Sequence, residues 1–177
     1  MKWPLYIFVL LVPMLTGCYA VLPAKHDNKV AITKDNLKIL NGYYINISDT
    51  QGRYQSSNLW NDINHMSFKE PIYDAKGGVM LLVLNEKRIN VTLILGDSLR
   101  DSRILKGKIK DGYFVTRKKF LLIGIPLLLY VEKSLKMQLA LTSDSNLLVD
   151  SKAGAYAAVF MSAGNTSKRQ SQYKRVK

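Results

Sequence analysis

The chain has 177 residues, with 26 lysines and arginines against 13 aspartates and glutamates, which gives a formal net charge of +13. This length suits one domain with a sizeable hydrophobic core. The single cysteine excludes an intrachain disulfide, and two histidines are too few for a histidine-based zinc site. The basic balance favours anionic partners such as lipid headgroups or acidic polysaccharides.

The first 17 residues have the organisation of an export signal. A charged start at Lys2 precedes an apolar run from Pro4 to Leu15. That run is shorter than the ~20 residues that a transmembrane helix needs. A charged start, a short apolar run and small residues before a cut are typical of a secretory signal.

The next four positions resemble the lipobox of bacterial lipoproteins. The resemblance implies that Leu15, Thr16 and Gly17 form the signal-peptidase motif and that Cys18 carries lipid, including palmitate. Two or more acyl chains hold a protein stably on a membrane, whereas one chain binds only marginally. The alternative is an ordinary secretory signal with a cysteine there by chance.

A lipid-anchored protein is expected in the cell envelope, and nucleic acid is then not expected as a partner. Tyr19 is not the acidic residue that retains some lipoproteins at the inner membrane, so we expect the outer membrane. Residues 18–32 are predicted to be a tether between the lipid and the domain.

Two short helices and a first strand are predicted before residue 64. Thr33 can cap a helix over 33–40, which Gly42 then ends. Residues 42–48 alternate in polarity and predict a strand. Residues 59–63 are consistent with one helical turn that packs through Leu59, Trp60 and Ile63.

From Phe68 onward the pattern predicts β-structure. Strands are expected over 79–84 and 89–95, and over 104–110 and 113–118 on either side of Asp111-Gly112. That dipeptide favours a hairpin turn, because a type I′ turn needs positive φ at both central residues.

The third quarter of the chain contains an uncharged run over 120–131. Gly124 and Pro126 argue against a helix there, so we expect two strand pieces bent between these residues. Further strands are expected over 135–141, 147–149 and 154–161.

Residues 165–177 are basic, contain no acid and show no periodicity. They are predicted to be a disordered tail. The alternative is a contact with anionic lipid, to which each basic residue contributes ~1 kcal/mol near the surface.

Together these elements predict an all-β fold. We expect an antiparallel meander of about 8–10 strands over residues 33–164, with a short N-terminal helix. Closure into a lipocalin-like barrel would hide the edge strands of such a sheet.

The chain resembles the lipocalin-like lipoproteins of unknown function of the Bacteroidetes type. The resemblance covers residues 36–164 and rests on the lipobox, the Gly-x-aromatic first strand, the meander, and the phrases 105–114 and 145–150. Lipocalins carry Gly-x-Trp on the first strand and a partner arginine near the last. Here the first strand has Gly42-Tyr43-Tyr44, and no partner arginine is evident. The resemblance implies no catalytic residues.

Two groups of residues are candidate binding sites. A basic patch around the Asp111-Gly112 hairpin is a candidate contact for anions or a membrane surface, the alternative being a solvent-facing edge; it comprises Lys106, Lys108, Lys110, Arg117, Lys118 and Lys119. Aromatic residues are candidates for lining a cavity, the alternative being core packing; they are Tyr43, Trp60, Tyr113, Tyr130 and Tyr156.

The function expected from these features is non-catalytic. The first hypothesis is a binder of a small apolar or amphipathic ligand in the interior of the barrel. The second is an accessory lipoprotein with a filled core that contacts envelope polyanions or a protein partner. No metal or cofactor is expected. An enzyme using His65 has no supporting constellation, since no Gly-x-Ser-x-Gly elbow or phosphate-binding loop occurs.

Overall fold

The structure is a computed structural model that describes residues 28–48, 57–64, 77–125, 129–159 and 161–176. The export signal, Cys18, most of the tether and both histidines lie outside the described residues. Predictions about those residues therefore stay predictions.

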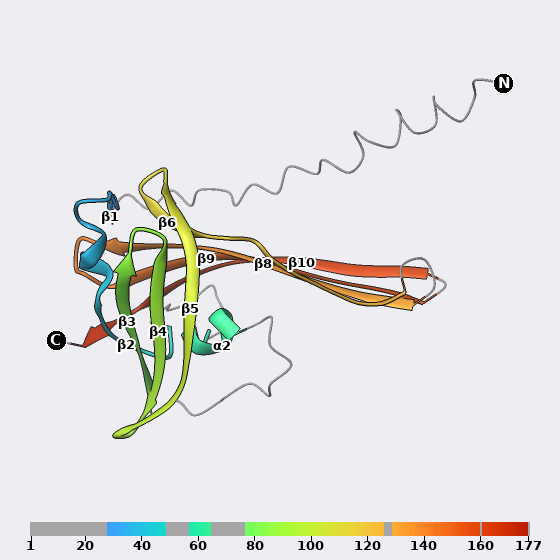
Figure 1. Ribbon diagram of the computed structural model, residues 1–177, viewed down its shortest axis with the longest axis horizontal. Helices are drawn as coiled ribbons and strands as arrows, with labels where there is room; N and C mark the ends of the chain where they lie inside the picture. Colours follow the sequence, from blue (N-terminus) through green and yellow to red (C-terminus); the bar gives the residue numbers. More distant parts are fainter. Residues whose placement is uncertain (1–27, 49–56, 65–76, 126–128, 160, 177) are drawn as a thin grey trace.

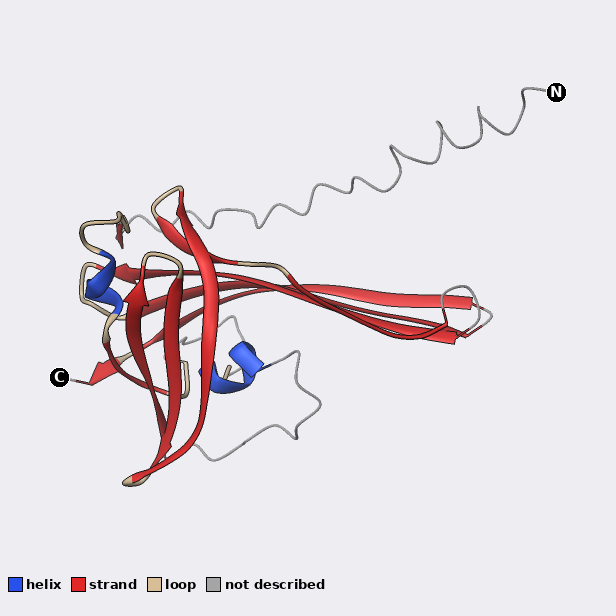
Figure 2. Ribbon diagram, in the orientation of Figure 1, coloured by secondary structure: helices blue, strands red, loops and turns tan. Residues whose placement is uncertain are grey.

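The described chain is one antiparallel sheet with little helix, so the all-β prediction is confirmed (Figure 2). The sheet has 11 strands. They are β1 (Lys29–Val30), β2 (Gly42–Ile45), β3 (Gly77–Asn85), β4 (Arg88–Leu95), β5 (Ser98–Lys110), β6 (Tyr113–Thr116), β7 (Lys119–Ile125), β8 (Leu129–Thr142), β9 (Leu147–Val159), β10 (Met161–Tyr173) and β11 (Arg175–Val176).

The strands pair in the order β10-β9-β8-β6-β5-β4-β3-β2-β11, with β1 and β7 also paired to β8. This path is open, so the predicted closure into a barrel is not established. Its two end strands are nevertheless consecutive in the chain, since only Lys174 separates β10 from β11. The carbonyl of Lys174 accepts a hydrogen bond of 2.9 Å from the N–H of Ile45 in β2.

The predicted disordered tail is wrong, because residues 165–176 form most of β10 and all of β11. β10 pairs with β9 without a break from Met161 to Tyr173. The hydrophobic pattern does not predict this strand, because its inward-facing positions carry side chains whose hydroxyl groups form hydrogen bonds in the interior. The Ser57 hydroxyl lies 2.6 Å from that of Ser171 and 2.9 Å from that of Tyr173, which is fully buried.

The predicted tether is also too long at its C-terminal end. Lys29 and Val30 form β1 against Thr142 and Leu141 of β8, and Ile32 is buried in the core. The described sheet therefore begins before the predicted domain boundary at residue 33.

Both predicted helices are present, and the first is shorter than expected. It is a 3-10 helix, η2 (Leu37–Leu40), preceded by a turn in which Thr33 and Asn36 exchange side-chain-to-backbone hydrogen bonds. These bonds satisfy the backbone locally and delay the helix. The second helix, α2 (Leu59–Asn64), buries Leu59, Trp60 and Ile63 as expected.

The Asp111-Gly112 turn is confirmed, with φ of 53° at Asp111 and 74° at Gly112. The later strands are longer than expected, because 147–149 and 154–159 belong to one strand, β9. In Figure 1, β7 and the adjoining parts of β8, β9 and β10 extend from the body of the molecule as a long, flat arm.

An arginine from β11 packs over β2. Arg175 pairs with Tyr44 in the sheet, and its guanidinium lies 6.0 Å from the centre of the Tyr44 ring. The same guanidinium donates to the carbonyls of Asn41 and, at 3.5 Å, Ile39 at the end of η2. The Tyr44 hydroxyl donates to Leu40 at 3.0 Å. One side chain thus holds η2, β2 and the chain end together.

Replacing Tyr44 by phenylalanine should make the fold less sensitive to alkali. Burial raises the pKa of Tyr44 from 10.0 to about 12, so the unfolded chain ionises this group first. The contribution of the neutral Tyr44 hydroxyl to the free energy of unfolding is complete below about pH 10 and is lost as the pH rises towards 12. Tyr44→Phe should cost about 1 kcal/mol near neutrality, through the lost hydrogen bond.

Above about pH 10, the free energy of unfolding of Tyr44→Phe should fall less steeply with pH than that of the parent, by up to ~1.4 kcal/mol per pH unit. Urea unfolding at a series of pH values between neutrality and pH 12 measures both effects. Equal slopes in the two proteins would contradict this account.

Candidate functional site

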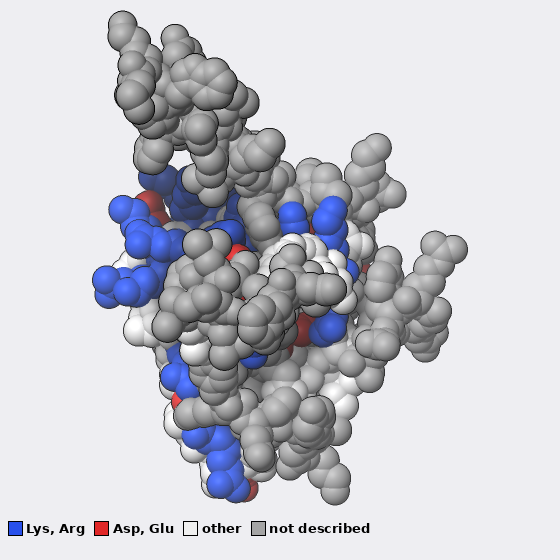
Figure 3. Space-filling view, turned by 90° about the vertical axis from the view of Figure 1, so that its right-hand side faces the viewer, with Lys and Arg blue, Asp and Glu red and all other residues white. Residues whose placement is uncertain are grey.

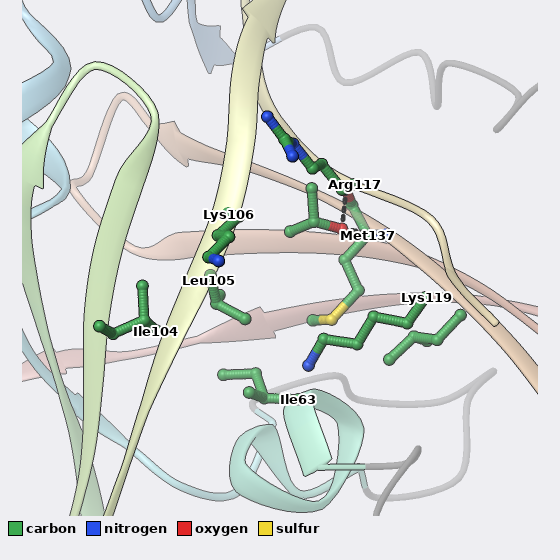
Figure 4. A pocket seen from close by; sticks show the side chains of 9 residues that line it. Ile63, Ile104, Leu105, Lys106, Arg117, Lys119 and Met137 are labelled. Atoms are coloured by element: carbon green, nitrogen blue, oxygen red, sulfur yellow. Dashed lines mark hydrogen bonds between the residues drawn. The ribbon is translucent and has the colours of Figure 1, made fainter. Parts of the chain in front are cut away.

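An apolar pocket of about 270 Å³ lies where the sheet splits beside α2 (Figure 4). β5 pairs with β6 only over Gly107–Lys110, so among the described strands its preceding half has no partner on that side. The resulting gap faces Ile63 of α2. The lining is Ile63, Ile104, Leu105, Lys106, Thr116, Arg117, Lys119, Leu135 and Met137.

The apolar and charged groups of the pocket are segregated. Leu105, Leu135 and Met137 are buried strand residues that form its wall. All three ionisable lining residues are cations. The Arg117 N–H donates to the Lys106 carbonyl at 2.8 Å, which keeps these two residues beside each other.

The third cation, Lys119, is the one most affected by its surroundings. Figure 4 shows its side chain extending between Met137 and Ile63. Desolvation, with a smaller contribution from the Arg103 guanidinium, lowers the pKa of Lys119 below its ordinary value. An anion placed beside this ammonium group would favour its charged form and so oppose the lowering of its pKa.

A hydroxyl group fixes one wall of the pocket. Thr116 is buried at the end of β6, and its hydroxyl donates to the carbonyl of Met137 at 3.1 Å. The same oxygen accepts from the N–H of Met137 at 2.9 Å. The side chain therefore replaces a pair of backbone hydrogen bonds where β6 ends.

A second hollow, which we call the basic hollow, has a volume of about 510 Å³. Its charged lining residues are all cations, namely Lys87, Lys108, Lys110, Arg117, Lys118 and Lys136. Figure 3 looks at the molecule from the side of the arm tip and shows basic side chains on several sides of it, with few acidic ones. This hollow suits an extended anion rather than an apolar ligand.

The structure divides the basic patch predicted from the sequence. Lys108, Lys110 and Lys118 line the basic hollow, Lys106 and Lys119 line the apolar pocket, and Arg117 lines both. Sequence reasoning missed Lys87 and Lys136 in the basic hollow. It also missed Ile63, Leu135 and Met137 in the pocket, because no local pattern indicates that α2 packs beside the split in the sheet.

The predicted aromatic lining is not assembled in either hollow. Trp60 and Tyr113 are buried in the core, Tyr43 is half-buried in β2, and Tyr156 is exposed on the arm. The position of Tyr130 in β8 is described, but its side chain is not. Core packing, the alternative reading, accounts for Trp60 and Tyr113.

A partly buried polar network joins α2 to β10. Asp62 accepts from Arg169 at 2.9 Å and from the Tyr173 hydroxyl at 3.0 Å. Burial, followed by the Asp62 charge, raises the pKa of Tyr173. Every named group has a partner, so this network holds α2 in place rather than presenting a reactive group.

Within the described ranges, no three His, Cys, Asp or Glu side chains are grouped closely enough to hold a metal ion. The same residues include no helix with the length and apolar character needed to cross a bilayer.

Comparisons of the chain with protein-family models, curated protein sequences and solved structures found no match.

Replacing Thr116 by valine should loosen the wall of the pocket. Valine keeps the shape but leaves the N–H and C=O of Met137 without their partner, at a cost of about 1–3 kcal/mol. Thr92→Val is the matched control, because Thr92 is a buried strand residue whose hydroxyl contacts are long, 3.4 Å each. Urea unfolding of both variants should show the larger loss for Thr116→Val; equal losses would contradict the assigned role.

Proposed function

We propose that the protein is a lipid-anchored, non-catalytic binder of an anionic amphiphile, whose acyl chain enters the pocket between α2 and β5. The observation that carries this proposal is the apolar wall bordered by Lys106, Arg117 and Lys119. Apolar surface supplies affinity, and a few placed polar groups supply orientation and specificity.

The pocket volume sets the size of the bound group. About 270 Å³ lies just below the roughly 300–1,000 Å³ of typical small-molecule pockets. The pocket therefore suits one acyl chain or part of one. The centre of the sheet is lined by closely packed Leu, Ile and Val side chains, together with Trp60, Phe114 and Tyr173. That packing favours the pocket over the interior of the sheet as the binding place.

A lipocalin-like arrangement of the sheet belongs to the same proposal. The contact of Arg175 with Tyr44 and with the end of η2 corresponds to the Trp–Arg pair expected of lipocalins, with tyrosine in place of tryptophan. The continuity of β10 and β11 also supports it, because one chain segment pairs with both β9 and β2. Anchoring through Cys18 at the outer membrane would place the pocket near lipid.

A second candidate function is contact with an envelope polyanion, and the basic hollow favours it. Six cations line that hollow and no acid does. Such a surface attracts polyanions strongly at low ionic strength and weakly at high ionic strength.

Calorimetric titration with decanoate and decanol tests the amphiphile site. The full chain carrying Cys18→Ser should bind decanoate more tightly than decanol. Lys106→Gln combined with Lys119→Gln should weaken only decanoate, by roughly tenfold, because the lost contacts are to the charge. Decanoate affinity should also fall as the pH rises through the lowered pKa of Lys119.

Filling the pocket should remove both ligands. Leu135→Phe puts additional volume where the wall faces open space, and should weaken decanoate and decanol alike. Leu84→Phe is the matched control, because Leu84 is 49% exposed on β3 and lies outside the pocket lining. Unchanged binding in a folded Leu135→Phe protein would refute the site.

The basic hollow is tested by retention on a polyanionic column. Lys108→Ser with Lys110→Ser should elute at lower salt than the parent. Lys34→Ser with Lys38→Ser makes the same change of charge at exposed positions outside the hollow. Equal shifts for the two pairs would show a response to net charge alone and contradict a specific polyanion surface.

A further inference from the structure

The arm is a four-stranded antiparallel sheet in the order β7-β8-β9-β10. In the described structure β7 pairs only with β8, so the arm begins at an edge strand. Figure 1 shows the arm extending well away from the rest of the sheet. A long projecting sheet with an open edge requires an explanation, since such edges promote association.

The outer part of the arm is uncharged. No charged residue occurs in 120–131 or in 153–167, whereas β8 contributes Glu132 and Lys133 to the middle of the arm. Large apolar side chains there are exposed to solvent: Phe120 by 55%, Ile123 by 44%, Leu122 by 43% and Val131 by 38%. Exposed apolar surface of this kind marks an interaction site.

Both faces of the arm carry this apolar surface. Residues paired across the strands share a face, so Ile123, Val131 and Ala157 lie on one face and Leu122, Glu132 and Tyr156 on the other. Phe120 and Leu122 are thus exposed on the face opposite to Ile123 and Val131. A second copy of the chain packed face to face would cover only one of these surfaces, whereas lipid surrounds an inserted arm on both.

Cations lie at the base of the arm. Lys136, Lys152 and Lys168 stand directly beside one another on β8, β9 and β10. Lys119 and Lys133 lie on the opposite face, nearer the tip. Basic residues near a membrane surface are attracted by anionic headgroups. The base is therefore complementary in charge to an anionic leaflet.

The dimensions fit one leaflet. At ~3.3 Å per residue, Leu129 at the arm tip is roughly 10 Å from Glu132 and roughly 23 Å from Lys136. The hydrocarbon core of a bilayer is ~30 Å thick, and an interfacial element sinks ~5–10 Å into it. The arm is therefore long enough to enter the headgroup–acyl boundary and too short to cross the bilayer.

We propose that the arm formed by β7 and the adjoining parts of β8, β9 and β10 inserts into one leaflet of a membrane rich in anionic phospholipid. The uncharged outer part of the arm enters the lipid, and the charged residues nearer the base, lysines above all, face the headgroups. This is a second membrane contact, separate from the acyl anchor and from binding of an amphiphile in the pocket.

An environment-sensitive fluorophore on the arm tests the proposal directly. The full chain with Cys18→Ser has no other cysteine, so Ile123→Cys gives a single labelling site. On vesicles of phosphatidylglycerol and phosphatidylcholine, the label should brighten several-fold and be quenched by brominated acyl chains. A label at Leu99→Cys, 67% exposed on β5, should do neither. A label at position 123 that stays in water on vesicle-bound protein would overturn the proposal.

Vesicle flotation provides the matched comparison. Ile123→Glu with Val131→Glu should weaken binding roughly tenfold or more, because carboxylates must leave water. Leu84→Glu with Leu99→Glu, at exposed positions outside the arm, should leave binding unchanged. Equal binding by the two double variants would overturn the proposal, as would equal binding to vesicles of phosphatidylcholine alone.

Light scattering without lipid distinguishes the rival occupant. The proposal predicts a monomer in both double variants and in the parent. A dimer of the parent that Ile123→Glu with Val131→Glu dissociates would assign the arm to a second copy of the chain. Failure of decanoate binding, by contrast, concerns only the pocket.

Discussion

The whole arrangement depends on the last segment of the chain, which pairs with two distant strands at once. β10 extends β9 at one end of the sheet order, and β11 pairs with β2 at the other end. Only Lys174 separates the two strands, and buried Tyr173 and half-buried Arg175 flank it. The Tyr173 hydroxyl bonds Ser57 and Asp62, and Arg175 covers Tyr44, so α2 and η2 both take their positions from this segment.

β10 connects the pairing of the last segment with the two proposed membrane-related sites, the pocket and the arm. Residues of β10 near Tyr173 hold α2, whose Ile63 faces the pocket, while the distal residues of β10 belong to the arm. Lys119 and Leu135 are paired in the sheet and line the pocket at the base of the arm. With the arm in a leaflet, the cationic side of the pocket would therefore lie near the headgroups. β1 pairs at the far end of β8, and the ten residues between Cys18 and Lys29 can span up to ~40 Å, enough to reach the same leaflet.

Much of the fold could be predicted from local patterns in the sequence, but little of the candidate site could. Alternation over 89–95 identified β4, because buried positions of a strand favour apolar residues. The Asp111-Gly112 pair identified a hairpin, because the positive φ of its turn favours these residue types. β10 was missed because Ser171 is buried through a hydrogen bond instead of apolar surface. Arg175 was missed because only the pairing of β11 with β2, far apart in the chain, brings it to Tyr44. The lysines of the basic patch were recognised from the sequence. Their division between two hollows was not, because it depends on the residue at which the pairing of β5 with β6 stops.

The central proposal is that the pocket between α2 and β5, at the base of the arm, binds an acidic lipid. Native mass spectrometry of the full chain, purified in mild detergent from the cells that produce it, tests this most directly. The account predicts one acidic lipid bound non-covalently to each chain and released on collisional activation. Chains that carry no such lipid, or only neutral lipid in proportion to its abundance, would contradict it.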